Sequence, residues 1–325
     1  MATPFKYTGS LSKVIKRLSL PALLKLRNVS VGIRNLALHE VDYRFNKSFH
    51  YLMKNPGKKV RDKFIEALNV YIEAEDHHLN LVKSVIASLH NASLLIDDIE
   101  DNAYFRRGEI CSHRVFGVGM TLNSANFIYF NCMDRIAREN CPEANKVFLE
   151  EMLELHRGQG LDILSTEDCI NPGLDGYVYI VAAKTGGLFR LAMRLLSALA
   201  GKKDEYSGFS VLLGVYFQIF DDYLNLKKEG DDITEGKFGF PLVCAMQQKM
   251  LNRRDSERLQ CLLALKTMEP GLKKEALKIL LDCGAVAHTR NVLVRLYNDL
   301  CSQLEGLAAN PQLKQLLQLL QTRIN

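Results

Sequence analysis

Two separate segments of the chain each end an apolar run in paired aspartates. In the first, Asp97, Asp98 and Asp101 follow residues 90–96. On a helix, Asp97 and Asp101 are four residues apart and project from the same side. Like charges at the end of a buried segment cost free energy unless a cation balances them, and ligands that are all oxygens suit Mg²⁺ better than Zn²⁺. A metal site fits this cluster, but for one cluster alone a solvated acidic helix end is the more common structure.

The second segment, residues 217–225, repeats the arrangement with Asp221 and Asp222. Two helices that each present carboxylates from an apolar wall describe opposite sides of one cavity, so the repetition favours a metal site. Arg106 and Arg107 follow the first cluster. Carboxylates that bind metals, beside guanidinium groups that bind anions, suit a phosphate or diphosphate substrate, because Mg²⁺ usually bridges protein carboxylates to substrate phosphates.

Five segments carry a resemblance to a known family. They read HNASLLIDDIEDNAYFRRG from His90, HRGQGLD from His156, KTGGLF from Lys184, FQIFDDYLN from Phe217 and ITEGKFGFP from Ile233. In order and mostly in spacing, these segments resemble the trans-prenyltransferases, or trans-isoprenyl diphosphate synthases, and most closely the geranylgeranyl diphosphate synthases of animals and fungi. The similarity extends from near Pro56 to the C-terminus. It implies an enzyme that joins an allylic prenyl diphosphate (geranyl or farnesyl) to isopentenyl diphosphate.

The resemblance also implies the fold and the site. The fold would be an all-α isoprenoid synthase domain, a bundle of mostly antiparallel helices around a deep central cavity. Mg²⁺, about three ions with the bound diphosphate, would be held by Asp97, Asp101 and Asp221. The residues implied to be catalytic are Asp97, Asp98, Asp101, Lys184, Asp221 and Asp222. Those implied to bind isopentenyl diphosphate are Lys58, Arg61, His90 and Arg107, and those on the allylic side are Arg106, Lys184, Thr185, Gln218 and Lys237.

In this reaction the diphosphate leaves as an anion, and the allylic cation that remains is attacked by the alkene of isopentenyl diphosphate before a proton is lost. Apolar walls exclude water, which would quench the cation. Aromatic faces such as Phe217 or Phe189 are expected to stabilise its charge. The chemistry requires no acid–base dyad and no covalent nucleophile, and the sequence contains no recognisable catalytic triad.

Several of these residues also have ordinary structural explanations. Lys58 and Arg61 lie at i and i+3 inside an expected helix start, where backbone N–H groups favour an anion. The same pair fits a basic turn at the surface. His90 alone is more often a hydrogen-bonded core histidine than a ligand. Three further residues share one helix face and are expected either to line the cavity or to support residues that do: His156, Gln159 and Asp162.

Gly186 and Gly187 stand within a helical pattern, where each glycine costs roughly 1 kcal/mol. We therefore expect the helix to be interrupted there. The functional interpretation is a kink that turns Lys184 and Thr185 toward the leaving diphosphate, and the resemblance points the same way. The structural interpretation is close packing of helices at the two glycines.

Product length is partly readable beside the first aspartate cluster. In the family the growing chain runs along the helix that bears this cluster, so the residues one turn before Asp97 decide whether it is blocked. These residues are Ala92 and Ser93. Both are small, as in the family's C20 synthases, whereas C15 synthases commonly have an aromatic residue there. The resemblance thus implies a pocket of C20 depth.

Two departures from the family pattern keep a second reaction open. C20 synthases usually have a longer loop, with another diphosphate-binding lysine, where this chain has only residues 226–232. Lys227 or Lys228 is the available substitute. Phe220 stands where the closest relatives often have Arg. Some animal members of the family are terpene synthases, which cyclise a geranylgeranyl or farnesyl diphosphate to a hydrocarbon without isopentenyl diphosphate.

The basic residues assigned to isopentenyl diphosphate favour prenyl transfer, because a cyclase does not need all four of them. A third hypothesis is a catalytically silent subunit that regulates an active synthase. The complete aspartate motifs argue against it.

Composition limits the class of protein. The chain has 325 residues, 47% of them hydrophobic, which is enough for a large core. No apolar run approaches the roughly 20 residues of a membrane span, so no transmembrane segment is expected. Eight cysteines are scattered singly, as in reduced intracellular proteins. Basic residues are not interleaved with stacking aromatics, which argues against nucleic-acid binding.

Basic charge is concentrated near the N-terminus. Seven of the 42 Lys and Arg residues precede Glu40, the first acidic residue. We interpret residues 1–40 as a basic leader, either a mitochondrial transit peptide or an arm without a defined partner. Residues 41–325 are expected to form one domain. The protein is predicted to be intracellular, in the cytoplasm or, if the leader is a transit peptide, in mitochondria, and the resemblance implies a homodimer.

From Phe49 onward the chain reads as a succession of helices. Apolar residues recur three and four positions apart, as at Phe64, Leu68 and Tyr71, and alternating strand-like runs are absent. Helix boundaries are expected at the breaks Pro56–Gly57, Cys141–Pro142, Pro172–Gly173, Pro270–Gly271 and Asn310–Pro311. The pattern predicts an all-α bundle.

Overall fold

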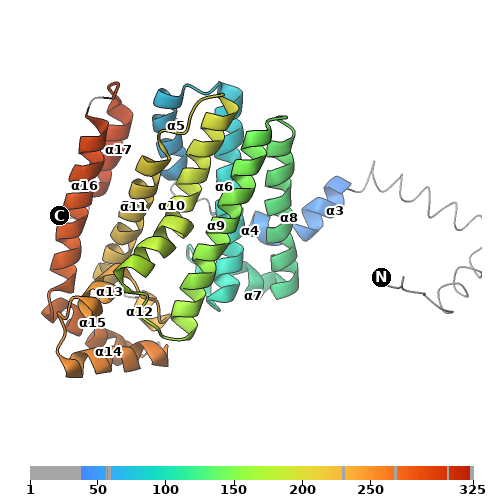
Figure 1. Cartoon of the computed structure of the whole chain (residues 1–325). Helices are drawn as coiled ribbons and strands as arrows, with labels where there is room; N and C mark the ends of the chain where they lie inside the picture. Colours follow the sequence, from blue (N-terminus) through green and yellow to red (C-terminus); the bar gives the residue numbers. More distant parts are fainter. Residues whose placement is uncertain are drawn as a thin grey trace, which may run out of the picture.

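The computed structural model describes residues 38–55, 57, 60–228, 231–266, 269–305 and 307–322. These residues are almost entirely helical, so the predicted all-α class is confirmed (Figure 1). The helices that enclose the interior are α5 (Val60–Ile72), α6 (Asp76–Glu100), α8 (Val118–Ala137), α9 (Pro142–Glu167), α10 (Gly173–Leu199) and α11 (Ser207–Lys228). The others are α3 (Leu38–Phe45), α4 (Lys47–Met53), α7 (Ser112–Phe116), α12 (Asp231–Thr234), α13 (Phe240–Gln247), α14 (Arg253–Leu265), α15 (Pro270–Asp282), α16 (Ala285–Leu304) and α17 (Pro311–Gln321).

The central helix of the bundle is α10, which packs against α5, α6, α9, α11 and α13. A Cβ atom on Gly214 of α11 would lie 2.3 Å from the Cα of Gly186, and one on Gly158 of α9 would lie 2.7 Å from the Cβ of Ala183. Only glycine permits such close approach. Since α10 continues through Gly186 and Gly187, the predicted interruption is wrong. Packing against α9 and α11 offsets the conformational cost of the glycines, as the structural interpretation proposed.

Prolines begin several helices at the expected positions. Pro142, Pro270 and Pro311 are the first residues of α9, α15 and α17. Proline suits this position because its φ is already helical and its missing N–H would have had no partner within the helix. The side chain of Asn310 caps α17 by accepting a backbone hydrogen bond at 3.0 Å. The helix boundaries predicted at these prolines and at Pro172–Gly173, before α10, are confirmed. The boundary predicted at Pro56–Gly57 involves Pro56, which lies outside the described residues.

A short hairpin that the sequence analysis missed follows α6. Strand β1 (Phe105–Arg106) pairs antiparallel with β2 (Glu109–Ile110). The turn residues Arg107 and Gly108 have φ angles of 55° and 81°, as type I′ hairpin turns require. Strands of two residues are too short to produce an alternating pattern, which explains the omission.

By length and hydropathy, α6 alone among the described helices meets the requirements for crossing a membrane. The helix is apolar only on average, since polar residues such as His90 and Asn91 interrupt it, and the absence of a transmembrane segment stays a prediction. The apolar side chains of α6, among them Val82, Val85 and Leu89, are buried where it packs against α4, α5, α8 and α10. Packing within the bundle accounts for its composition.

The predicted leader falls almost wholly outside the described residues, because the structure describes nothing before Leu38. Its boundary and role, and the assignment of residues 41–325 to one domain, stay predictions.

Candidate active site

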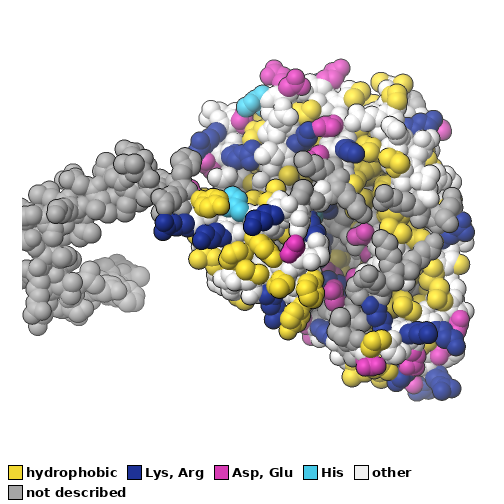
Figure 2. Space-filling model, turned by 180° about the vertical axis from the view of Figure 1, so that it is seen from behind, with side chains coloured by type: hydrophobic (Ala, Val, Ile, Leu, Met, Phe, Trp, Pro, Cys, Tyr) yellow, Lys and Arg dark blue, Asp and Glu magenta, His cyan; other side chains and the backbone are white. Residues whose placement is uncertain are grey.

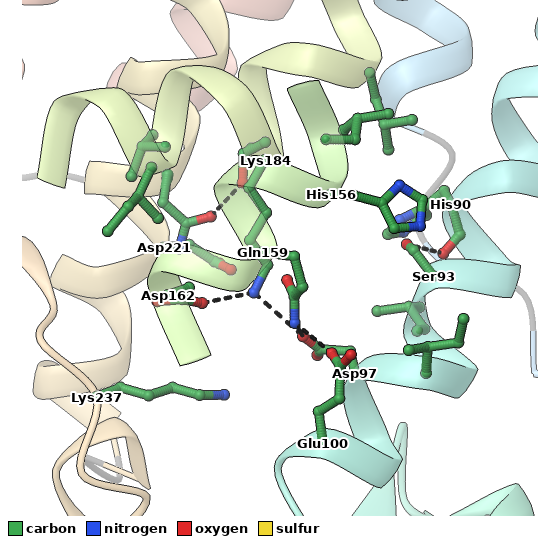
Figure 3. A pocket seen from close by; sticks show the side chains of 18 of the residues that line it. His90, Ser93, Asp97, Glu100, His156, Gln159, Asp162, Lys184, Asp221 and Lys237 are labelled. Atoms are coloured by element: carbon green, nitrogen blue, oxygen red, sulfur yellow. Dashed lines mark hydrogen bonds and ion pairs between the residues drawn. The ribbon is translucent and has the colours of Figure 1, made fainter. Parts of the chain in front are cut away.

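A cavity of about 370 Å³ lies among α6, α9, α10, α11 and the segment before α13. In the space-filling view, acidic and basic side chains border a hollow in the molecular surface (Figure 2). Figure 3 shows charged side chains from these elements pointing toward one another across the pocket. Apolar side chains complete the lining, among them Leu89, Leu94, Met152, Leu155 and Leu188. The cavity thus combines a highly charged region with an apolar one.

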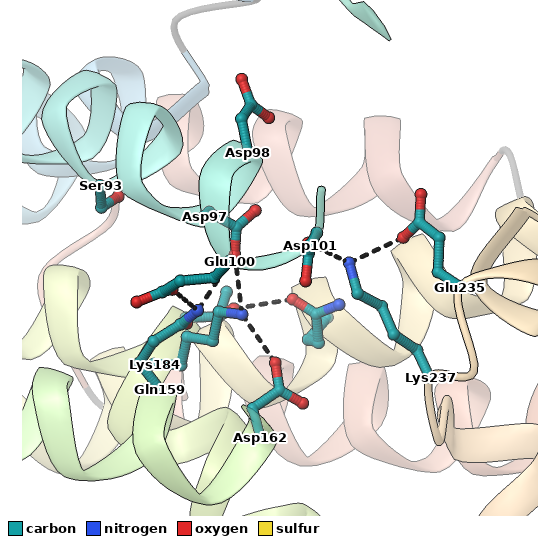
Figure 4. Close-up of polar contacts among 12 residues, drawn as sticks. Ser93, Asp97, Asp98, Glu100, Asp101, Gln159, Asp162, Lys184, Glu235 and Lys237 are labelled. Carbon is teal, nitrogen blue, oxygen red and sulfur yellow. Dashed lines mark hydrogen bonds and ion pairs between the residues drawn. The ribbon is translucent and has the colours of Figure 1, made fainter. Parts of the chain in front are cut away.

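Asp97 occupies the charged region, near the C-terminal end of α6. Its Oδ1 accepts hydrogen bonds from Lys184 Nζ at 3.2 Å and Gln159 Nε2 at 3.3 Å (Figure 4). Its Oδ2 accepts one from Arg106 at 3.1 Å. A helix C-terminus disfavours carboxylates, so the compensating cations come from other elements. Burial opposes the charge of this carboxylate, but Lys184, Lys237 and Arg106 outweigh it and lower the pKa to about 2.

Asp101 lies one helical turn beyond Asp97. Its Oδ2 accepts a hydrogen bond from Lys237 Nζ at 2.6 Å, and the same ammonium group contacts Glu235 at 2.8 Å (Figure 4). Burial raises the pKa of Asp101 even though Lys237 opposes the shift. Burial disfavours the charge of Lys237 too, but Asp101 and Glu235 outweigh it and raise the pKa of the ammonium group. This lysine is therefore firmly cationic.

Asp98, between these two, points away from them (Figure 4). Successive residues on a helix face directions about 100° apart, and Asp98 is buried outside the cavity lining. Its Oδ1 accepts a hydrogen bond from Arg106 Nε at 2.6 Å. Arg106 thus bridges Asp97 and Asp98 and fastens the hairpin to α6. The sequence predicts a catalytic role for Asp98, but its side chain does not line the cavity. In the structure, Asp98 positions Arg106.

The second aspartate pair shows a similar division. Both oxygens of Asp222 are occupied: Oδ2 accepts hydrogen bonds from Tyr177 OH at 2.6 Å and Phe240 N at 2.7 Å, and Oδ1 from Gln218 at 2.8 Å. These bonds join α10, α11 and the start of α13. Burial raises the pKa of Asp222. Asp221 lines the cavity on the opposite wall from Asp97, close enough to favour the charge of Arg61.

Basic groups also gather on the side of the cavity formed by α5 and α6. Arg61 is half-buried, its guanidinium group lies 5.8 Å from the centre of the Phe189 ring, and its Nε finds no hydrogen-bond partner among the described residues. Burial lowers its pKa to about 10, which leaves it charged at neutral pH. Burial, followed by Arg61 and Arg107, keeps the pKa of His90 well below its usual value, so this imidazole is neutral. Arg107 donates a hydrogen bond to Asn91 at 3.3 Å. Such a cluster fits a bound anion.

The structure brings most of the predicted site residues together. Those that line the cavity are Arg61, His90, Asp97, Arg106, Lys184, Thr185, Gln218, Asp221, Asp222 and Lys237. Predicted residues that the structure describes next to the lining are Asp98, Asp101 and Arg107. Lys58 lies outside the described residues, as do the side chains of Lys227 and Lys228. The catalytic and binding roles of all these residues stay predictions.

Two expectations about the cavity wall need correction. Of the two small residues before Asp97, Ser93 lines the cavity, whereas Ala92 is buried against α4 and α8. Phe189 and Phe217 are not lining residues of the described cavity, and Phe189 instead supports Arg61. Aromatic rings reach the cavity from Tyr129 and Tyr177. In both cases, the direction in which the side chain leaves its helix decides whether it reaches the cavity. The sequence gives this direction only to within a residue or so.

The face shared by His156, Gln159 and Asp162 does line the cavity. Asp162 holds Lys184 Nζ at 2.7 Å, and Gln159 also donates to Glu100 at 2.6 Å. Sequence reasoning overlooked Glu100, although its spacing of three residues from Asp97 placed both on one helix face.

Sequence reasoning also overlooked Asp232, which lines the cavity beside the second aspartate pair. Burial, reinforced by Asp222, raises its pKa to about 8. This residue comes from a separate short helix and gave no comparable signal.

Comparison with known proteins agrees with this geometry. The family described as polyprenyl synthetase matches residues 42–280. The chain is 39% identical over 279 residues to a geranylgeranyl pyrophosphate synthase of Emericella nidulans, covering 83% of this chain and 70% of that protein. It is 36% identical over 292 residues to a geranylgeranyl pyrophosphate synthase of Dictyostelium discoideum, covering 87% and 95%. A terpene synthase of Matsumurasca onukii is 36% identical over 293 residues, covering 88% and 95%. The chain belongs to the polyprenyl synthetase family and is an enzyme of the prenyltransferase type.

Proposed function

We propose that this enzyme condenses farnesyl or geranyl diphosphate with isopentenyl diphosphate to form geranylgeranyl diphosphate. The observation that carries the proposal is the presence of two basic regions in one cavity. Arg61 and His90 line one side, with Arg107 close behind. Lys184 and Lys237 contact the aspartates on the other side. An enzyme that ionises a single diphosphate needs only the second region, whereas condensation needs both.

The carboxylates fit Mg²⁺ as the family's usual metal. Asp97, Asp101 and Asp221 offer only oxygen donors, which a hard divalent cation prefers. These residues would hold about three ions with the bound diphosphate. Bound Mg²⁺ supplies charge neutralisation that lets the diphosphate leave as a stable anion.

The chain's own cations are placed to receive the diphosphate. Lys184 and Lys237 are paired with Asp97 and Asp101. Both ammonium groups lie at the cavity and exchange these partners for phosphate oxygens when substrate enters. Arg106, held by Asp98, is fixed in the same region. Charge-assisted hydrogen bonds of this kind are shorter and stronger than neutral ones.

On the other side, Arg61 and neutral His90 bind and orient the second diphosphate. An imidazole without charge donates one hydrogen bond, while the guanidinium group supplies the positive charge. The apolar wall around Leu89, Leu155 and Leu188 excludes water from the cation. The protein thereby holds the alkene of isopentenyl diphosphate next to the reacting carbon, which is the main contribution of positioning to catalysis.

The decisive experiment compares two incubations of the purified protein with Mg²⁺. One contains farnesyl and isopentenyl diphosphates, and the other contains geranylgeranyl diphosphate alone. Alcohols released by phosphatase and extracted hydrocarbons are both measured. Formation of geranylgeraniol in the first incubation supports the proposal and excludes a silent subunit. Failure to consume isopentenyl diphosphate would overturn it.

A terpene synthase is the second candidate. The similarity to the Matsumurasca onukii protein, together with buried Phe220 next to Asp221, favours it. An apolar ring at this position adds bulk behind the second aspartate pair. A hydrocarbon formed from geranylgeranyl diphosphate alone would establish this reaction. Its absence, with only chain extension observed, would exclude it.

We further propose that the enzyme is a homodimer. Outward-facing apolar side chains lie on α8 and α9, which pack against each other, and they include Phe130, Leu149 and Leu153. Clustered exposed apolar residues of this kind commonly mark an interface. Sedimentation of the wild type and of Phe130→Glu tests this: a shift from dimer to monomer in the variant supports the α8–α9 face, and a monomeric wild type contradicts the proposal.

The cellular location is proposed to be the cytoplasm, or mitochondria if residues 1–40 act as a transit peptide. The excess of basic residues before Glu40 supports a targeting role. Fusion of residues 1–40 to a fluorescent protein would test it by microscopy. A diffuse cytoplasmic signal would contradict the mitochondrial alternative.

A further inference from the structure

A second group of metal-ligand residues lies far from the aspartates. His77 and His78 are in the first turn of α6, and Glu139 follows the end of α8. These ends of α6 and α8 lie together at the end of the bundle opposite α7 (Figure 1). Since a helix rises 1.5 Å per residue, the histidines are about 30 Å from Asp97 along α6. This group is therefore separate from the active site.

The three side chains converge on one point. One ligand atom from each lies within 4.8 Å of the others. Nε2 of His77 is 3.3 Å from Oε2 of Glu139, and Nε2 of His78 is 3.5 Å from the same oxygen. Neighbouring residues on a helix normally diverge by about 100°, so two adjacent imidazoles directed at one carboxylate oxygen form an unusual arrangement.

The separations are also compatible with two ligands of one metal ion. Hydrogen bonds between nitrogen and oxygen are usually about 2.7–3.2 Å long, and those to a charged group are at the short end. Two ligand atoms that are each about 2.0–2.1 Å from a tetrahedral Zn²⁺ lie about 3.4 Å apart. Both nitrogen-to-oxygen separations are close to this ligand-to-ligand distance, and His77 Nε2 is also 3.3 Å from the other oxygen of Glu139, Oε1.

The three side chains also differ in their exposure to solvent in a way that suits a metal site. The side chains of His78 and Glu139 are 21% and 18% exposed, whereas that of His77 is 69% exposed. Two ligands are thus held by the bundle and the third lies on the solvent side, where water can complete the coordination.

We propose that His77, His78 and Glu139 bind one divalent transition-metal ion, with Zn²⁺ as the favoured metal. Two imidazoles and one carboxylate are ligands that Zn²⁺ accepts readily and that Mg²⁺ does not prefer. The ion joins the start of α6 to the turn between α8 and α9. It stabilises this end of the bundle without taking part in prenyl transfer.

Calorimetric titration of the chelator-treated full chain with Zn²⁺, in excess Mg²⁺, tests the site. The Asp97→Ala variant is titrated in parallel, because it removes a ligand of the catalytic site. We expect one Zn²⁺ to bind with unchanged affinity in this variant and to raise the melting temperature by mass action. Co²⁺ substitution should give a visible absorption spectrum typical of low-coordinate imidazole ligation.

Single substitutions identify the ligands. His77→Ala, His78→Ala and Glu139→Gln should each weaken Zn²⁺ binding by at least about 10-fold, since even residues that only support a ligand often contribute that much. His77→Ala is the most informative because its exposed side chain contributes little to packing. His50→Ala and Glu143→Gln are matched controls at other exposed positions and should bind Zn²⁺ like the wild type.

Two results would overturn the proposal. One is a wild type that binds no Zn²⁺ once excess Mg²⁺ occupies the catalytic carboxylates. The other is a set of three variants that retain wild-type affinity while circular dichroism shows them folded.

Discussion

The two aspartate pairs look alike in the sequence but are built differently. Asp97 lies at a helix end, where lysine and arginine side chains from other elements surround it. Asp222 lies within a helix and is held by a tyrosine, a glutamine and a backbone N–H. Within the first pair, Asp97 reaches the cavity, whereas Asp98, turned by about 100°, holds Arg106. Within the second pair both side chains border the cavity, but the oxygens of Asp222 are held by the scaffold. Adjacent identical residues therefore have separate tasks.

Replacing Asp97 or Asp221 is expected to have the largest effect on activity. Asp97→Ala and Asp221→Ala should each lower kcat by roughly 10³-fold, because the diphosphate loses the charge stabilisation on which its departure depends. Asp97→Ala should cost some stability, because Lys184 and Arg106 lose an acceptor, but the helical fold should survive in both variants. Steady-state kinetics and far-UV circular dichroism check both points. Asp134→Ala, at an exposed ion pair on α8, is the matched control. Near-normal rates in either variant would refute the assignment.

The neighbour of Asp221 should behave in the opposite way. Asp222→Ala leaves three buried donors without their acceptor, so we expect the free energy of unfolding to fall by about 3 kcal/mol. Asp221→Ala should change it far less. Urea unfolding of both variants without metal measures the difference. Equal stability of the two variants would remove the distinction between a cavity-facing and a scaffold carboxylate.

This distinction marks the limit of what the sequence could reveal. Periodicity and proline breaks predicted the helices and their starts, and motif spacing predicted most of the cavity lining. From the sequence, Mg²⁺ was assigned to Asp97, Asp101 and Asp221, but Asp98 and Asp222 were also predicted to be catalytic, because the sequence does not show that scaffold contacts hold these two carboxylates. Uncertainty in helical phase affected Ala92 and Phe189, whose side chains turn away from the cavity.

Contacts between segments that are distant in the sequence could not be predicted either. The close approach of Gly186 to Gly214 decides that α10 runs unbroken, and a propensity argument about one segment cannot include it. The contact of Lys184 with Asp162 depends in the same way on how α9 meets α10. The resemblance supplied roles for residues whose spacing alone left alternatives open, as at Arg61 and His90.

A smaller effect is expected at the basic cluster of Arg61, His90 and Arg107. Arg61→Ala should weaken isopentenyl diphosphate binding by roughly 1.5 to 3 kcal/mol, the value of a charge-assisted contact. Lys58→Ala is expected to act similarly. The KM for isopentenyl diphosphate should rise while metal-dependent release of pyrophosphate from the allylic substrate alone changes little.

An exposed arginine gives the control for that measurement. Arg138→Ala removes an equivalent charge at the surface of the same protein and should leave both KM values unchanged. If Arg61→Ala instead abolished ionisation of the allylic substrate, the two basic regions would not be functionally separate.

The last prediction contrasts the pH dependence of Asp97 with that of Asp232. Cations around Asp97 hold its pKa at about 2, whereas burial and Asp222 raise that of Asp232 to about 8 from an ordinary value of 3.8. The folded protein therefore keeps a proton on Asp232 that the unfolded chain releases. Between about pH 4 and pH 8 this proton uptake lowers stability as pH rises, because the unfolded state binds fewer protons. The contribution of Asp97 has the opposite sign: it is complete above pH 3.8 and is lost only as pH falls through about 2.

Asp232→Asn separates these contributions, because the amide keeps the size of the side chain and cannot ionise. In chelator, so that no metal binds the neighbouring carboxylates, the variant should match the wild type in stability at pH 4 and exceed it at pH 8. Urea unfolding across this range gives the difference at each pH. If the difference stayed constant, or if the wild type gained stability over the variant as pH rose, Asp232 would be ionised in the folded protein. The charge balance around the second aspartate pair would then resemble that around the first.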